Sequence, residues 1–305
     1  MSLETDLLID RRRLKRGLAF WRAAAIVAVL AAVALWAASE AGPARGLLGT
    51  YVARLTVQGT ITEDRDRAAA LAEIARDDRA KALIVVIDSP GGTVAGGEAL
   101  HRAIARVAER KPVVAVLTGT AASAGYMVAL PAERIFAREA TVTGSIGVIL
   151  QTAEVSTLLD RLGIRPETIA SGPLKDQPSP FRPLSEEGRA ALEAVVKDLH
   201  AQFVAMVAKG RKKSEQEVQA LADGRVMTGR QALAAGLIDE IGGEAEARQW
   251  LASVKEVGLE HPVRDIAAPP AQRLLERILR EAGKAFWDEW LRLDRGVLLW
   301  HGPTR

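Results

Sequence analysis

The 305-residue sequence contains no cysteine. A disulfide framework, a thiolate zinc site and a thiol nucleophile are therefore excluded, although many exported proteins also lack disulfides. Histidine is scarce, and none of the four follows a glycine-rich strand end: His101, His200, His261 and His301. His101 lies within a helical pattern, residues 98–107, where packing is a more common role than catalysis. A Ser/His/Asp triad therefore has weak support.

Neither sign of charge dominates, because the sequence has 41 lysines and arginines and 38 aspartates and glutamates. Aromatic residues make up only 4% of the chain. Nucleic-acid binding needs basic residues clustered along the folded body with aromatics among them. Here both signs alternate through most of the chain, so no nucleic-acid partner is expected. The positive excess gathers near the N-terminus, in Arg11, Arg12, Arg13, Lys15 and Arg16.

Metal and nucleotide sites also lack their usual residues. Asp88 has no second carboxylate or histidine at a useful spacing, so a turn-capping role is favoured over metal binding. The glycines at 92–97 superficially resemble a phosphate loop, but Glu98 stands where the lysine would be. No metal and no cofactor are expected.

One long hydrophobic run covers residues 17–39, where the only charged residue is Arg22. Its guanidinium can extend to the membrane interface, which leaves a span of roughly the 20 residues that a bilayer core requires. Trp21 and Trp36 lie near the ends of the run, as in an aromatic belt. The run predicts a transmembrane anchor.

Membrane orientation follows from the basic cluster that precedes the run. The positive-inside rule places residues 1–16 in the cytoplasm and everything after the anchor outside. A cleaved signal peptide is the alternative, with small residues at 37–39 as a cleavage position. The rest of the chain is exported in either case, and residues 40–49 are interpreted as a linker.

Beyond the linker, β-rich segments alternate with helical patterns. This alternation is typical of βαβ units and predicts an α/β fold with a largely parallel sheet. Residues 83–87 are continuously apolar, as expected of a strand buried on both faces. The predicted strands are 51–57, 82–87 and 113–117, and the predicted helices are 65–76, 97–110, 190–208 and 214–222.

Two strand ends carry candidate chemistry, because sites in parallel sheets form at the carboxyl ends of strands. Residues 88–92, Asp-Ser-Pro-Gly-Gly, are expected to break one strand, and small residues around Ser123 follow the next. A serine nucleophile needs a base and oxyanion donors. A lysine can be the base when burial disfavours its charged form. Lys175 follows a loop of small and apolar residues, although a lone loop lysine is usually solvated.

Five segments resemble, in order, the successive motifs of the signal peptide peptidase A family. The resemblance covers about residues 50–250, and five ordered motifs are far more specific than any one of them. It implies a Clp protease/crotonase-like superfold without cofactor or metal. The segments are Asp88-Ser-Pro-Gly-Gly92, Ala121-Ala-Ser-Ala-Gly-Tyr126, Thr143-Gly-Ser-Ile-Gly-Val148, Ser171-Gly-Pro-Leu-Lys-Asp176 and Asp223-Gly-Arg-Val226.

The resemblance also implies roles for single residues. Ser123 would be the nucleophile, Lys175 the general base, and Ser145 the hydroxyl that orients the lysine amine. The backbone N–H groups of Gly92 and Ala124 would form the oxyanion hole.

The chain departs from the family pattern in two ways. Residues 124–127 are Ala-Gly-Tyr-Met, where the family commonly has two glycines and then paired aromatics. The chain also carries one copy of the domain, whereas long members carry two. In the short members, the serine and lysine of one site come from neighbouring protomers of a ring-like oligomer. A homo-oligomer with shared active sites is therefore expected here.

The expected protein is a membrane-anchored serine endopeptidase that degrades cleaved signal peptides and other unfolded apolar peptides. It would lie in a bacterial inner membrane, crossing it once, with a periplasmic peptidase domain at residues 50–255. A tail at 256–305 contains an amphipathic helix that docks on the protein or, alternatively, contacts the membrane surface. A crotonase-like acyl-coenzyme A enzyme and a non-catalytic membrane scaffold are the rival interpretations.

Overall fold

The computed structural model describes Trp21 and residues 49–266. The chain divides into two units, Met1–Gly49 and Thr50–Arg305, and the fold described here belongs to the second. The predicted anchor, apart from Trp21, and the amphipathic helix of the tail lie outside the described residues. Within those residues, no helix is both long and apolar enough to span a bilayer.

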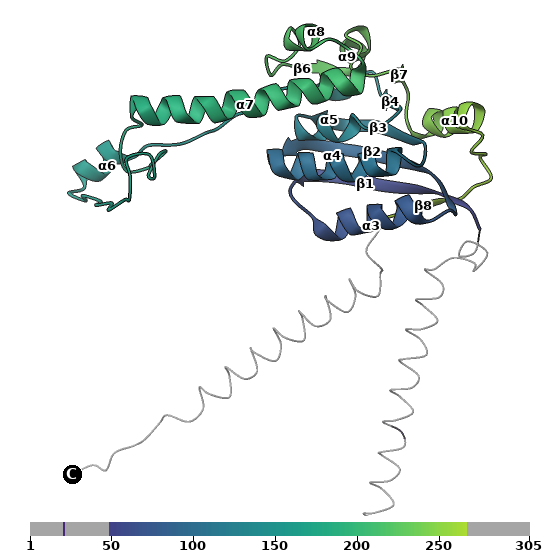
Figure 1. Cartoon of the computed structure of the whole chain (residues 1–305), viewed down its shortest axis with the longest axis horizontal. Coiled ribbons are helices and arrows are strands. Elements are labelled where there is room, and N and C mark those ends of the chain that lie inside the picture. Colours follow the sequence, from purple (N-terminus) through teal and green to yellow (C-terminus); the bar gives the residue numbers. More distant parts are fainter. Residues whose placement is uncertain (1–20, 22–48, 267–305) are drawn as a thin grey trace, which may run out of the picture. The chain divides into compact units, whose positions relative to one another are not determined.

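One mixed sheet organises the described part of the chain (Figure 1). Its main path runs β6-β5-β3-β2-β1-β8, with β4 paired to β3 and β7 paired to β4. Every pairing is parallel except that of β5 with β6, so the prediction of a largely parallel α/β sheet is confirmed. The strands are β1 (Tyr51–Ile61), β2 (Ala80–Gly92), β3 (Val113–Ala122), β4 (Arg134–Ala137), β5 (Val142–Gly144), β6 (Val226–Thr228), β7 (Glu240–Ile241) and β8 (Val263–Asp265).

Helices connect these strands, and side-chain caps define where several of them begin. The side chains of Asp64, Thr93 and Ser185 accept hydrogen bonds from N–H groups in the first turns of α3, α4 and α7. Each cap satisfies a donor that has no partner within its helix. The helices are α3 (Arg65–Arg76), α4 (Val94–Ala108), α5 (Ala124–Ala129), α6 (Ser156–Arg161), α7 (Glu186–Arg211), α8 (Glu215–Gln219), α9 (Gly229–Ala234) and α10 (Glu244–Lys255).

The central strand β2 is buried on both faces, as predicted. Leu83 and Val85 join the larger hydrophobic cluster, together with residues of α4 and α5. Ile84 points to the other face and joins a smaller cluster with Leu251 of α10. Each such side chain contributes about 1.5–3 kcal/mol by leaving water. This burial holds the carboxyl ends of β2 and β3 side by side.

Strand β2 does not end at Asp88, as the sequence predicts, but continues to Gly92. Strand β1 is also longer than predicted, and it pairs with this extension through Thr60 with Gly91 and Ile61 with Gly92. The pairings of β2 with β1 and with β3 are both irregular just before this point. Such bulges can accommodate a proline that cannot donate to the ladder, here Pro90.

Strand β8 pairs with β1 through Val263–Asp265. The sheet therefore includes residues beyond 255, the predicted limit of the peptidase domain.

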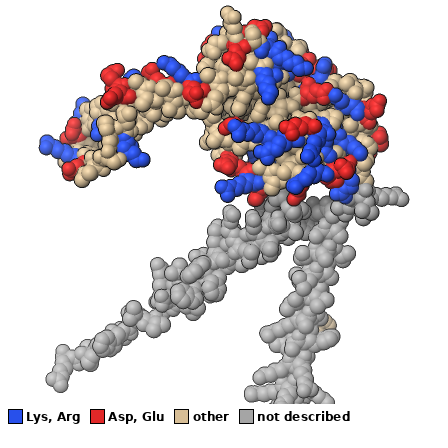
Figure 2. All heavy atoms as spheres, viewed as in Figure 1, with Lys and Arg blue, Asp and Glu red and all other residues tan. Residues whose placement is uncertain are grey.

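A segment that we call the arm, residues 149–202, contains α6 and the first part of α7. Phe203, Val204 and Val207 near the end of α7 are buried, whereas the first half of the helix buries only Gly188. Figure 1 shows α6 at the far end of α7, beyond the sheet. In Figure 2 charged side chains are scattered over the arm, and tan, uncharged surface lies between them.

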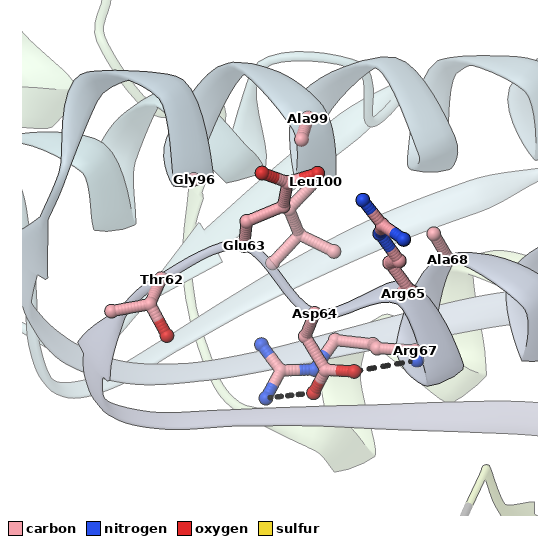
Figure 3. A pocket seen from close by; sticks show the side chains of 9 residues that line it. All are labelled: Thr62, Glu63, Asp64, Arg65, Arg67, Ala68, Gly96, Ala99 and Leu100. Carbon is pink, nitrogen blue, oxygen red and sulfur yellow. Dashed lines mark hydrogen bonds and ion pairs between the residues drawn. The ribbon is translucent and has the colours of Figure 1, made fainter.

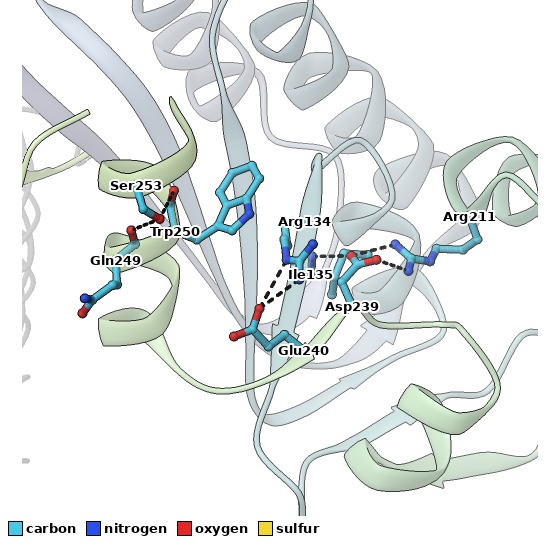
Figure 4. A network of polar contacts seen from close by, with 8 residues as sticks. All are labelled: Arg134, Ile135, Arg211, Asp239, Glu240, Gln249, Trp250 and Ser253. Carbon is cyan, nitrogen blue, oxygen red and sulfur yellow. Dashed lines mark hydrogen bonds and ion pairs between the residues drawn. The ribbon is translucent and has the colours of Figure 1, made fainter. Parts of the chain in front are cut away.

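An ion pair joins the C-terminal end of α7, just beyond the arm, to the part of the chain that contains the sheet, which we call the body (Figure 4). Arg211 binds both carboxylate oxygens of Asp239 at 2.6 and 3.0 Å, and its Nε donates to the carbonyl of Gly236. Asp239 also accepts the backbone N–H of Ile135 in β4 at 2.8 Å. Burial raises the pKa of Asp239, but the Arg211 and Ile135 hydrogen bonds outweigh it, and the pKa lies below its ordinary value.

We predict that Arg211→Met lowers the free energy of unfolding by about 2–4 kcal/mol, because it leaves a half-buried carboxylate without its cation. Chemical denaturation of the purified full chain measures this change. The matched control is Arg225→Met, which breaks the exposed Arg225–Asp223 pair and is expected to leave the free energy of unfolding nearly unchanged. Equal losses in the two variants would contradict the prediction.

The same pair predicts a pH dependence. A carboxylate with a lowered folded-state pKa contributes stability above its ordinary pKa, about 4, and loses that contribution as the pH falls through the lowered value. The stability gap between the wild type and Asp239→Asn should therefore be full at neutral pH and shrink below about pH 4. A gap that widened in acid would be inconsistent with the pair.

Candidate active site

Ser123 lies where β3 ends and α5 begins. Its backbone has φ 54° and ψ −122°, and its side chain makes no capping hydrogen bond to the helix. A positive φ at a residue other than glycine costs of order 1–3 kcal/mol, and such strain is concentrated at functional sites. The partly exposed Ser123 side chain is thus held on a strained turn from strand to helix, a geometry that exposes the serine hydroxyl in some hydrolases.

The irregular end of β2 at Gly91 and Gly92, which we call the Gly91 and Gly92 turn, lies against this serine through Gly91. Gly91 has φ 122°, and a Cβ atom there would come within 2.9 Å of the Ser123 Cβ. A Cβ on Gly92 would lie 1.9 Å from the carbonyl oxygen of Ile61. Only glycine fits at either position, so Gly91 presents bare main chain to the Ser123 side chain and Gly92 packs closely on β1. Backbone N–H groups in such a place can stabilise an oxyanion.

Ala124 supplies a second N–H as the first residue of α5. The first bond within the helix runs from the Met127 N–H to the Ser123 carbonyl, so the Ala124 N–H has no acceptor in its own helix. Where the family commonly has glycine, the Ala124 methyl is accommodated by Gly97, at which a Cβ would lie only 2.9 Å away. Tyr126 and Met127 are buried in the core.

Ser145 is brought next to Ser123 by the pairing of β5 with β3. Ala122 pairs with Gly144, and the Ser123 N–H donates to the Gly144 carbonyl at 2.9 Å. Ser145 also has a positive φ, 49°, and its N–H donates to the Arg225 carbonyl at 2.8 Å. The two serines therefore follow paired residues on neighbouring strands.

Lys175 is not near this turn within one chain. Its side chain is exposed, and it lies on the arm close to Gln177, which packs against Gly188 at the start of α7. The other end of α7 meets the body, where Gly210 packs against Leu130 after α5. The 22 residue steps from Gly188 to Gly210 correspond to roughly 33 Å of helix at 1.5 Å per residue. A single protomer therefore does not assemble the predicted Ser/Lys pair.

Two other residues considered from the sequence have structural roles. The His101 Nδ1 donates to the Met127 carbonyl at 2.9 Å, and burial lowers the pKa of His101, so its packing role is confirmed. Asp88 accepts the N–H of Thr120 at 2.9 Å and so bridges β2 to β3 instead of capping its own turn. Within residues 49–266 no cluster of acidic and histidine side chains could hold a metal ion.

No role for Ser89 is predicted from the sequence, although it lies within the Asp88–Gly92 motif. This side chain is fully buried and contacts the Gly91 turn. Its position in the sequence, between a buried apolar strand and a pair of glycines, was the only signal that its hydroxyl has a partner there.

A small pocket lies near the carboxyl end of β1 (Figure 3). Its volume is about 60 Å³, enough for a few water molecules or one small aliphatic group. The loop after β1 lines one side, and Ala68, Ala99 and Leu100 contribute apolar surface. None of the predicted catalytic residues lines it.

Comparison with known proteins gives two family matches. The model of peptidase family S49 matches residues 105–258, and that of the Clp protease family matches residues 53–151. The second match supports the α/β, Clp protease-like part of the fold prediction. Among solved structures, a ClpP1 mutant from Listeria monocytogenes aligns with a TM-score of 0.43 at 19% identity, over 62% of this chain and 91% of that chain.

Curated relatives agree with the S49 match. A candidate protease of Synechocystis sp. is 39% identical over 204 residues, 67% of this chain and 74% of the relative. A candidate signal peptide peptidase SppA of Enterococcus faecium is 37% identical, over 61% of this chain and 55% of its own length. Protease 4 of Salmonella typhi is 34% identical, over 54% of this chain and 27% of its own length.

These relatives confirm the resemblance to signal peptide peptidase A, and this chain spans only part of the length of the last two. Because the S49 model covers half of the chain and the Synechocystis relative is covered over 74% of its length, this chain belongs to peptidase family S49.

Proposed function

We propose that this chain is a serine endopeptidase that uses a Ser123/Lys175 dyad. The observation that carries the proposal is the strained backbone of Ser123, held at a helix start against the Gly91 and Gly92 turn. Membership of peptidase family S49 supports a hydrolytic role for that serine.

The proposed reaction passes through an acyl-enzyme. A neutral Lys175 amine takes the proton from the Ser123 hydroxyl, and Oγ attacks the peptide carbonyl. The N–H groups of Gly92 and Ala124 stabilise the oxyanion, and the lysine then gives its proton to the departing amine. In the second half of the reaction, the neutral Lys175 amine takes a proton from water, and the water oxygen attacks the acyl carbonyl. Ser123 then leaves and receives the proton from Lys175. Ser145 orients the lysine amine by a hydrogen bond.

The lysine of each site is proposed to come from a neighbouring protomer. Lys175 is exposed and distant from the serine of its own chain, so a second copy has to supply it. Enclosure between protomers would also remove water from the amine and favour its neutral form.

The surface of the arm supports this assembly. Large exposed apolar side chains gather there, and exposed apolar patches of this kind mark sites of association. A second copy of this chain is the proposed occupant, because contact along the arm brings Lys175 to another protomer. The exposed set is Ile149, Leu150, Val155, Leu158, Leu162, Ile164, Ile169, Leu174, Phe181 and Val195.

The proposed substrates are cleaved signal peptides and other unfolded apolar peptides. The name of the Enterococcus faecium relative supports this substrate class. The predicted anchor would hold the domain at the outer face of a bacterial inner membrane, near the place where such peptides are released. Anchor and location stay predictions from the sequence.

Covalent labelling tests the proposal against its two rivals. A fluorophosphonate probe should label the full chain, and the label should be lost in Ser123→Ala. A crotonase-like acyl-coenzyme A enzyme needs no activated serine, and a membrane scaffold needs none either. Equal labelling of the wild type and Ser123→Ala would overturn the proposal.

A further inference from the structure

We infer that Ser89 is a positioning residue that holds the oxyanion turn against the nucleophile. The inference rests on the proposed function and assigns a role to a side chain outside the proposed dyad. Ser89 is one of four buried polar residues in the described part of the chain, and its relative exposure is 0%.

The Ser89 hydroxyl makes contacts in two directions. It donates to the carbonyl oxygen of Gly59 on β1 at 2.6 Å and accepts the N–H of Gly91 at 3.1 Å. The Gly91 carbonyl also lies 3.2 Å from the hydroxyl, but the single proton favours the shorter bond to Gly59. One hydroxyl therefore connects the end of β1 to the turn that precedes the Gly92 N–H.

These contacts lie where regular pairing is interrupted. The register of β1 with β2 shifts between Gln58 and Thr60, which leaves Gly59 outside the ladder. A residue in a bulge loses its ladder partner, and bulges are frequent beside active sites. The Ser89 hydroxyl satisfies the Gly59 carbonyl and so connects the two strands across the bulge, just before pairing resumes at Gly91 and Gly92.

The same residue is packed against the start of α5. A Cβ on Gly125 would lie 2.8 Å from the Ser89 carbonyl oxygen, and Ser89 pairs with Ala121 on β3. Gly91, which the hydroxyl holds, lies against Ser123 itself. Ser89 thus touches both halves of the site, the oxyanion turn and the elements on either side of the nucleophile, without facing the substrate.

Replacing this hydroxyl should change the transition state more than substrate binding. Deleting one oxyanion donor outright lowers kcat by about 100- to 1,000-fold. Ser89→Ala keeps the Gly92 N–H but loosens its position, so we expect kcat to fall roughly 10- to 100-fold. KM for a synthetic signal peptide should stay within about twofold, because the hydroxyl does not contact the substrate.

The experiment measures four quantities on the full chain in detergent: kcat, KM, the fluorophosphonate labelling rate and the Ki of a peptide aldehyde. The hemiacetal oxygen of a bound aldehyde occupies the oxyanion site, so its Ki should rise by about the factor by which kcat falls. Ser89→Cys keeps a weak donor of similar size and should recover part of kcat, and it serves as the second variant if Ser89→Ala does not fold.

The matched control is Thr118→Val, which likewise removes one hydroxyl bond between neighbouring strands, from Thr118 on β3 to the carbonyl of Ile87 on β2 at 3.0 Å, but none to Gly91. Thr118→Val should leave all four quantities unchanged. If Ser89→Ala behaves like this control, or changes KM alone, the positioning role is wrong while the peptidase stands. If wild type and Ser123→Ala are equally unlabelled and inactive, the proposed function fails, and the role of Ser89 fails with it.

Discussion

Replacing either Ser123 or Lys175 by alanine is expected to lower kcat/KM on a synthetic signal peptide by about 10,000-fold or more. Nucleophile and base act as a unit, so losing one removes nearly all the rate that the pair supplies. Lys175→Arg should be equally inactive, because a guanidinium stays charged and cannot accept the serine proton.

The free energy of unfolding distinguishes the loss of a catalytic group from the loss of the fold. Lys175 is exposed in its own chain, so Lys175→Ala should change the free energy of unfolding by no more than about 0.5 kcal/mol. The matched control is Lys81→Ala, which removes another exposed lysine, on β2 outside the arm, and should keep full activity. A Lys175→Ala protein with more than a tenth of wild-type activity would refute the assigned base.

Mixing two inactive proteins is expected to restore activity. If each site takes its serine from one protomer and its lysine from the next, a protomer with Lys175→Ala still offers Ser123 to a neighbour with Ser123→Ala. In a randomly mixed ring of equal parts, about a quarter of the sites contain both intact residues. The recovered rate should therefore approach a quarter of the wild-type rate after subunit exchange. Cleavage of the synthetic signal peptide measures it.

The control mixture replaces the Lys175→Ala protein with the double variant Ser123→Ala/Lys175→Ala. No site in that mixture contains an intact serine, so its rate should stay at background. If the mixture of single variants also stays at background although the subunits exchange, each chain would have to supply both residues. The arm would then have to bend back toward its own serine.

Local pattern was sufficient for the sheet and for part of the site. The apolar run of β2 and the alternation of strands with helices predicted parallel strands whose carboxyl ends meet, and these ends do place Gly91 against Ser123. Ser145 follows β5, a strand that the pattern did not predict. The extension of β2 to Gly92 could not be predicted, because Pro90 and the glycines are locally unfavourable in a strand. Pairing with the long β1, across bulges, outweighs that preference.

Contacts between distant residues could not be found in the sequence. Arg211 and Asp239 are 28 positions apart, and their pairing exists only because α7 ends beside β4 and β7. The Ser89 bond to Gly59 likewise depends on a bulge 30 positions earlier. A short motif indicates which residues are present, but not which partners their polar atoms find.

The sequence by itself determined the chemistry that is available: no thiol, few histidines, and a serine and a lysine within five ordered motifs. Periodicity also determined the fold class, since apolar patterning depends on near neighbours. Only the tertiary structure decided that Ser123 occupies a strained turn and that Lys175 lies on an arm far from it. The Ser123 turn follows from the packing of β3 and α5 against the end of β2. The position of Lys175 follows from α7, because a helix of 26 residues fixes the distance between its two ends.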